Sequence, residues 1–152
     1  MPYKTSDARA QLLQTLAQAT EELASGLSAL TEAYELADEG TADRLERDLF
    51  NPLQLAYARA RRTHTEFAER HELPDRTFQA PVAGAPRHGL RGFLDSAADA
   101  VARAEGTLAG LQDSMLPVEV GDPPLRAGLE QVRELIGHFP ARTRELERTL
   151  GR

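Results

Sequence analysis

Apolar residues recur along this chain at intervals of three and four positions, which is the period of an amphipathic α-helix. Four segments carry the pattern, over roughly residues 6–38, 42–72, 90–116 and 123–150. A stripe of this kind needs partner helices to bury it, so the pattern predicts an all-α protein. The expected inward positions are Leu13, Leu16, Thr20, Leu23, Leu27, Leu30, Tyr34, Ala37; Leu45, Leu49, Leu53, Ala56, Ala60, His64, Phe67, His71; Leu90, Leu94, Ala97, Val101, Ala104, Leu108, Leu111, Met115; and Leu125, Leu129, Val132, Ile136, Phe139, Thr143, Leu146, Leu150.

Four amphipathic helices predict an antiparallel four-helix bundle. The 152 residues fit one domain, residues 1–152. Residues 73–89 contain several prolines and glycines and form a long loop between the second and third helices. A loop of this length can cross the bundle or fold over one end, so both topologies stay open, and we favour the up-down-up-down order.

Two prolines fall inside the predicted helices. Pro52 follows Asn51 in the second helix, and Pro140 lies late in the fourth. A proline inside a helix lacks the amide donor that its turn requires, and its ring crowds the preceding turn. The pair Asn51-Pro52 is also typical of a cap followed by the first residue of a new helix. We therefore expect the second and fourth helices to be kinked.

Composition and charge narrow the classes of function. The chain has 24 acidic and 18 basic residues, and its net charge of −6 argues against binding to nucleic acid. It has no cysteine, which excludes disulfides, thiol nucleophiles and thiolate metal cages. The first residues lack the apolar core of a secretory signal, and no apolar run reaches the length of a membrane span. We expect a cytoplasmic protein without a membrane partner.

The inward positions include few residues that could bind a metal ion or catalyse a reaction. Bundles that bind two metal ions project glutamates and a Glu-x-x-His pair into the core. The first, third and fourth stripes contain no acidic residue, histidine or cysteine, and no Glu-x-x-His occurs in the chain. No strand-to-helix elbow presents a serine nucleophile, and no glycine-rich phosphate loop is present. The sequence therefore predicts neither a catalytic site nor a cofactor.

Two histidines are the most suggestive residues. His64 and His71 lie seven positions apart on one face of the second helix. A neutral imidazole can bind a metal ion or carry a proton, or it can simply be satisfied by a neighbouring polar group. In an up-down-up-down bundle, His64 would lie near the height of Thr143, with Thr20 a turn or two away. These residues would form a polar layer that fixes the register of the helices.

Arg59, Arg61 and Arg62 form the densest basic cluster and are a candidate interaction surface or a solvated helix face. Arg59 is followed after four intervening residues by His64. This spacing resembles the ribonuclease signature of HEPN domains, which are also helical bundles. Ala60 stands where a polar residue often follows that family's arginine. The resemblance implies an RNA-cleaving activity that depends on Arg59 and His64.

Three interpretations of function follow. The first is a noncatalytic module that binds another protein or a second copy of itself as a homodimer. The second is a bundle that binds a small molecule or metal near His64 and His71, with the long loop as a lid. That loop would contribute Phe78, Arg87 and His88. The third is the HEPN-like ribonuclease.

Overall fold

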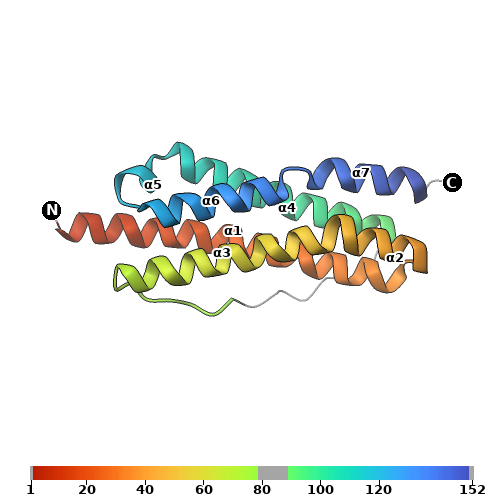
Figure 1. Ribbon diagram of the computed structural model, residues 1–152, viewed down its shortest axis with the longest axis horizontal. Coiled ribbons are helices and arrows are strands. Elements are labelled where there is room, and N and C mark those ends of the chain that lie inside the picture. The colour runs from red at the N-terminus through yellow and green to blue at the C-terminus, as the bar shows by residue number, and fades with distance from the viewer. Residues whose placement is uncertain (1, 79–88, 151–152) are drawn as a thin grey trace.

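The computed structural model describes residues 2–78 and 89–150, which are mostly helical and contain no β-strand (Figure 1). The all-α prediction is confirmed. The elements are α1 (Pro2–Leu36), α2 (Glu39–Leu45), the π-helical segment η1 (Glu46–Phe50), α3 (Asn51–Arg70), α4 (Gly89–Asp113), α5 (Leu116–Glu119), α6 (Pro123–Ile136) and α7 (Phe139–Leu150). The predicted boundaries of the first three helices agree with these within a few residues.

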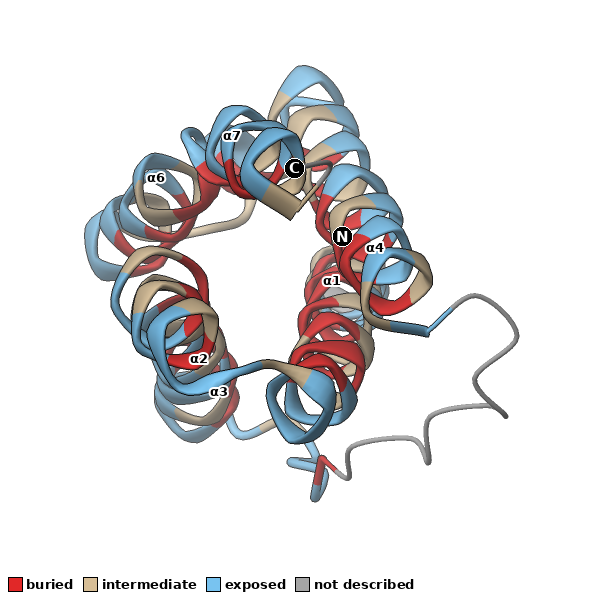
Figure 2. Cartoon of the chain, turned by 90° about the vertical axis from the view of Figure 1, so that its right-hand side faces the viewer, coloured by how far each residue is buried: buried red, intermediate tan, exposed pale blue. Residues whose placement is uncertain are grey.

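The elements pack as four rods around one core (Figure 2). α1 and α4 each form a rod. The segments α2, η1 and α3 follow one another without a break and form the third rod, while α6 and α7 form the fourth. Buried residues from all four rods belong to a single cluster, and their side of each helix faces the centre in Figure 2.

Contacts between side chains fix the direction of each rod. Glu22 of α1 accepts a hydrogen bond from Thr107 of α4 at 2.7 Å. Farther along α1, Gly26 lies against Ala97 and Val101, which precede Thr107 in α4. The two helices therefore run antiparallel. The rod α2–η1–α3 is also antiparallel to α1, since Tyr34 of α1 lies beside Glu46 and Ala17 of α1 lies beside His64.

The predicted up-down-up-down order is wrong. Because α3 and α4 are each antiparallel to α1, they run in the same direction, and α6 and α7 run with α1 (Figure 1). The ion pair between Arg133 of α6 and Glu105 of α4, with the bond from Arg91 of α4 to the carbonyl of Glu147 in α7, confirms that α6 and α7 oppose α4. Amphipathic spacing identifies the buried face of a helix but not its direction, and the long loop permitted both orders.

Most of the expected inward positions are buried, with two clear corrections. Tyr34 is 43% exposed and Met115 is 48% exposed. α1 contacts both α3 and α4 and buries a wider face than its predicted stripe, including Leu12, Ala19 and Ala33. Tyr34 lies at the edge of this wider face. Met115 adopts a left-handed conformation with φ 68° after α4 ends, which turns it away from the core.

Pro52 lies inside a continuous helical rod. Because proline lacks an amide hydrogen, the carbonyl of Asp48 loses its usual helical donor. The backbone widens here into η1, where the amide of Asn51 donates to the carbonyl of Glu46. Arg142 of α7 donates to the freed carbonyl of Asp48 at 3.5 Å. The proline is therefore accommodated by a π-helical turn and by a contact with another rod.

The fourth predicted helix, residues 123–150, is divided in two. α6 ends at Ile136, and Gly137 and His138 form a turn before α7 begins at Phe139. Pro140 thereby falls in the first turn of α7, where its missing donor costs little. The kinks expected at Pro52 and Pro140 stay predictions.

Two glycines allow rods to approach closely. A β-carbon at Gly26 would lie 3.1 Å from Leu53 and 3.4 Å from Val101, so Gly26 marks the point where α1, α3 and α4 meet. A β-carbon at Gly128 of α6 would overlap Oγ1 of Thr63 in α3 and lie 3.0 Å from the Cβ of that threonine. The second position is the tighter one, because the Cβ of Thr63 is fixed by its backbone.

We expect Gly128→Ala to lower the free energy of unfolding by about 1–3 kcal/mol, because the added methyl group must push α6 away from α3. Gly106→Ala is the matched control, since nothing lies within 4 Å of a β-carbon there. It should raise stability by about 0.5–1 kcal/mol through helix propensity. Denaturant unfolding measures both, and equal effects would contradict the close approach. Adding Thr63→Ala should recover part of the loss.

Candidate functional site

The end of α3 is shaped by a chain reversal. Glu72 adopts a left-handed conformation with φ 55°. The amide of Glu72 donates to the carbonyl of Glu69, and the amide of Leu73 donates to that of Ala68 at 2.8 Å. This bonding pattern is a Schellman motif, and Pro74 follows it, as is common after helix ends. The chain then turns back along the groove between α1 and α3.

The reversed segment covers His64. The imidazole Nδ1 lies 3.2 Å from Oδ1 of Asp75, and its ring meets the ring of Phe78 edge-on at 5.1 Å. Arg76 lies over the outer face of Phe78 and pairs with Glu21 of α1. The side chain of His64 is only 3% exposed. The inward position predicted for His64 is confirmed, and so is its proximity to the loop through Phe78.

Burial sets the charge state of His64. Removal from water lowers the pKa of His64 below its ordinary value of 6.5. The hydrogen bond and negative charge of Asp75 act to raise that pKa, and the nearby Arg76 acts to lower it. Burial outweighs the contribution of Asp75, so the imidazole is neutral at pH 7. A neutral imidazole held by a carboxylate has one ring nitrogen left for another partner.

A cavity of about 370 Å³ opens beside this pair. Leu13 and Ala17 of α1 form its apolar side, and the reversed segment contributes Leu73, Pro74 and Asp75. Among the described residues that line it, there is no serine, cysteine or lysine that the imidazole could activate. The arrangement suits the binding of a small molecule better than covalent catalysis.

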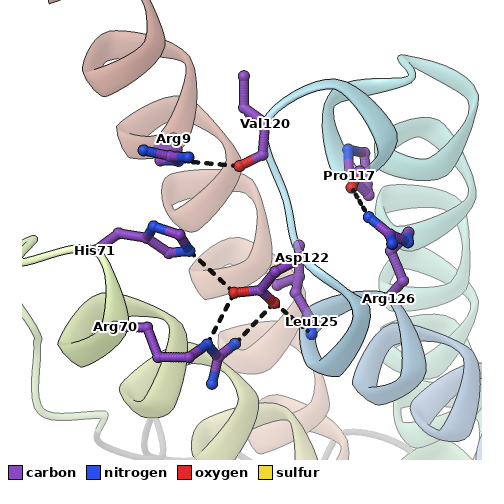
Figure 3. A network of polar contacts seen from close by, with 8 residues as sticks. All are labelled: Arg9, Arg70, His71, Pro117, Val120, Asp122, Leu125 and Arg126. Carbon is purple, nitrogen blue, oxygen red and sulfur yellow. Dashed lines mark hydrogen bonds and ion pairs between the residues drawn. The ribbon is translucent and has the colours of Figure 1, made fainter. Parts of the chain in front are cut away.

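His71 is not among the residues that line this cavity. It belongs to a different network, which Figure 3 shows. Arg70 binds Asp122 with two nitrogens, at 2.8 and 2.9 Å, and Nε2 of His71 lies 2.9 Å from the same carboxylate. Asp122 also caps α6, since its side chain accepts a hydrogen bond from the amide of Leu125 at 2.9 Å. We call these four residues the Asp122 clasp, which ties the end of α3 to the start of α6.

The clasp favours the ionised form of the Asp122 side chain. Burial acts to raise the pKa of Asp122, but the hydrogen bonds from Arg70, Leu125 and His71 outweigh it and lower the pKa to about 2. His71 is thus occupied by a structural partner, and the structure does not bring the two predicted histidines into one site.

The predicted polar layer is also divided. Arg142 of α7 contacts Asp48, so its neighbour Thr143 lies at the level of Asp48. The helical rise from Asp48 to His64 is about 24 Å, so Thr143 and His64 lie that far apart along the rod. Thr20 lies one turn beyond Ala17 and therefore near that level. Both threonines donate to carbonyls of their own helices, at Phe139 and Leu16, each at 2.8 Å. The layer of His64 and Thr143 was wrong because it depended on the up-down-up-down order.

The basic cluster points in three directions. Arg59 donates to Gln131 of α6, Arg61 lies over the ring of Tyr57 at 5.5 Å, and Arg62 pairs with Glu66 one turn along. Since Arg59 faces α6 and His64 faces α1, the structure does not bring together the two residues of the HEPN-like spacing. The other predicted loop residues, Arg87 and His88, lie outside the described residues.

A further shifted carboxyl group, that of Glu147, lies where α7 packs on α4. Burial raises the pKa of Glu147 to about 7, and the hydrogen bond and charge of Asp95 raise it as well, while Arg91 opposes them. Within the described part of the chain, no group of three or more histidine, cysteine, aspartate or glutamate residues is placed to hold a metal ion.

Three features of these sites left little or no signal in the sequence. Asp75 lies in an irregular loop, so no periodicity marked it as a partner of His64. Asp122 caps α6 before two prolines, but its charged partners come from the end of a distant helix. Tyr34 and Phe50 line an open apolar cleft of about 220 Å³ with Thr31 and Glu46, although Tyr34 was expected to be inward.

Comparison with known proteins found no matching family model, no similar curated protein and no similar solved structure. None of the described helices is both long enough and apolar enough to cross a membrane.

We expect Asp122→Asn to lower the free energy of unfolding at pH 7 by about 2 kcal/mol, because the amide keeps a helix cap but loses the charge that Arg70 neutralises. The wild-type contribution is present above the ordinary pKa of 3.8 and disappears as the pH falls through about 2. The two proteins should therefore converge in stability in acid. Denaturant unfolding at a series of pH values measures this, with Asp99→Asn on the exposed side of α4 as control.

We expect the imidazole of His64 to titrate below pH 6.5. Asp75→Asn should lower the pKa of His64 further, because it removes the negative charge that favours the protonated ring. Imidazole resonances followed by NMR measure both values. An unchanged titration in Asp75→Asn would mean that the two side chains do not interact.

Proposed function

We propose that this chain is a four-helix bundle that serves as a noncatalytic protein-interaction module, and that its partner docks at the cleft between α1 and η1. We call this site the Tyr34 cleft, lined by Thr31, Tyr34, Glu46 and Phe50. The partner is another protein or a second copy of the chain. The cytoplasmic location stays a prediction from the sequence.

One observation supports the proposal: among the described residues, the groove between α1 and α3 is covered at one end and open at the other. Near His64, the reversed segment fills it with Leu73 and Phe78. At the Tyr34 cleft, the described residues provide no such cover, and Tyr34 leaves 43% of its surface exposed. An exposed aromatic side chain beside a second one is typical of the anchor points of protein interfaces.

The polar groups in the core support a noncatalytic role. Thr20, Thr63 and Thr143 are buried, and each hydroxyl donates to the carbonyl four residues earlier in its own helix. These groups are satisfied structurally and have no free donor to offer a substrate.

A second candidate function is the binding of a small molecule in the cavity beside His64. It is favoured by the size of the cavity, about 370 Å³, and by the neutral imidazole held by Asp75 at its edge. A ligand there would lie under the reversed segment, as the sequence suggested for a lid. A thermal-shift screen separates the candidates, because ligands of this cavity should lose their effect in His64→Gln but keep it in Tyr34→Glu.

We expect Tyr34→Glu to abolish docking, because it places a charge in the apolar cleft. Peptides selected from a display library on the wild-type chain should bind the variant at least about tenfold more weakly. Leu55→Glu is the matched control, since Leu55 is 60% exposed but does not line the cleft. Sedimentation equilibrium of the same three proteins tests docking of a second copy. The proposal fails if neither peptide binding nor self-association depends on Tyr34.

A further inference from the structure

Nearly all of the net charge of the chain is concentrated in one short stretch. Residues 32–48 contain seven acidic and two basic residues, whereas the rest of the chain contains 17 acidic and 16 basic residues. This stretch includes the end of α1, all of α2 and the first part of η1. The acidic end of the molecule is therefore the end that carries the Tyr34 cleft.

One carboxylate of this stretch lines the cleft, and two others lie within one helical turn of residues that line it. Glu46 lines it directly. Glu35 adjoins Tyr34 in α1, and Asp43 lies one turn before Glu46. All three side chains belong to exposed residues, and no ion pair within 4.0 Å joins them to a cation among the described residues. The apolar floor thus has an acidic rim available for an outside partner.

The nearby arginines form their hydrogen bonds and ion pairs with other groups, although the charge of Asp43 also acts on Arg47. Arg44 donates to Thr149 of α7, and Arg142 of α7 donates to the carbonyl of Asp48. Arg47 forms an ion pair with its neighbour Asp48 at 3.0 Å. None of the three lines the cleft.

We propose that the Tyr34 cleft accepts a basic segment of another protein, which inserts one large apolar side chain between Tyr34 and Phe50 and places lysines or arginines against Glu35, Asp43 and Glu46. This inference rests on the proposed function and adds the chemistry of the partner. Opposite charges around an apolar anchor select the partner and accelerate its association. The same acidic rim repels nucleic acids and anionic membranes.

The probe is a short synthetic peptide in which one tryptophan is flanked by lysines and arginines. Two matched peptides replace either the basic residues with glutamate or the tryptophan with alanine. Fluorescence anisotropy should detect binding of the first peptide, weakened at least about tenfold when salt is raised from about 50 to 500 mM. Binding of the glutamate peptide with equal affinity, or no dependence on tryptophan, would overturn the inference.

Charge variants locate the contact. Neutralising the rim with Glu35→Gln, Asp43→Asn and Glu46→Gln should weaken the basic peptide at least about fivefold. The control combines Asp99→Asn, Glu130→Gln and Glu134→Gln, which removes the same net charge from exposed positions on α4 and α6. It should change affinity less than about twofold. Equal weakening by both sets would mean attraction to overall charge and would overturn the inference.

The display selection separates this inference from the proposed function. If the selected peptides depend on Tyr34 but are neutral or acidic, the interaction module stands and the basic partner is wrong. The basic partner is likewise wrong if the chain self-associates through Tyr34, since the occupant is then a second copy. If basic peptides bind Tyr34→Glu as well as wild type, both the cleft and its basic partner are wrong.

Discussion

The antiparallel packing of α1 on α4 is the contact on which the rest of the architecture depends. Gly26 lets the two helices and α3 meet closely, and the bond between Glu22 and Thr107 fixes their register. Because α3 and α4 are both antiparallel to α1, they run parallel to each other. The chain leaving α3 then turns back along the α1–α3 groove, where it covers His64 with Asp75.

The sequence predicted the helices well and their arrangement poorly, for a physical reason. Burial of an apolar stripe depends on local spacing, so positions such as Leu53, Val101 and Leu129 were identified correctly. The direction of a helix depends on the loop and on packing between distant residues. The local pattern also does not predict the π-helical turn before Pro52, because Arg142, which donates to the carbonyl of Asp48 there, comes from another rod.

The same distinction between local spacing and contacts with distant residues applies to the candidate sites. The inward position of His64 followed from its spacing, but its partner Asp75 comes from a loop whose path no periodicity describes. His71 was expected to share a site with His64, yet the start of α6 supplies Asp122 as its partner. Tyr34 continued an apolar stripe and was therefore expected inside. Its exposure became visible only when the width of the α1 contact face was known.

The pairing of α1 with α4 also bears on how the chain folds. Glu22 and Thr107 are 85 residues apart, so the most extensive helix pair in the core joins distant parts of the chain. Closing a loop of that length costs entropy before any contact is gained. A bundle whose neighbours follow one another in sequence avoids much of this cost, and such proteins fold fastest. The hairpin of α1 and α3 closes a much shorter loop, so it can form before α4 docks on α1.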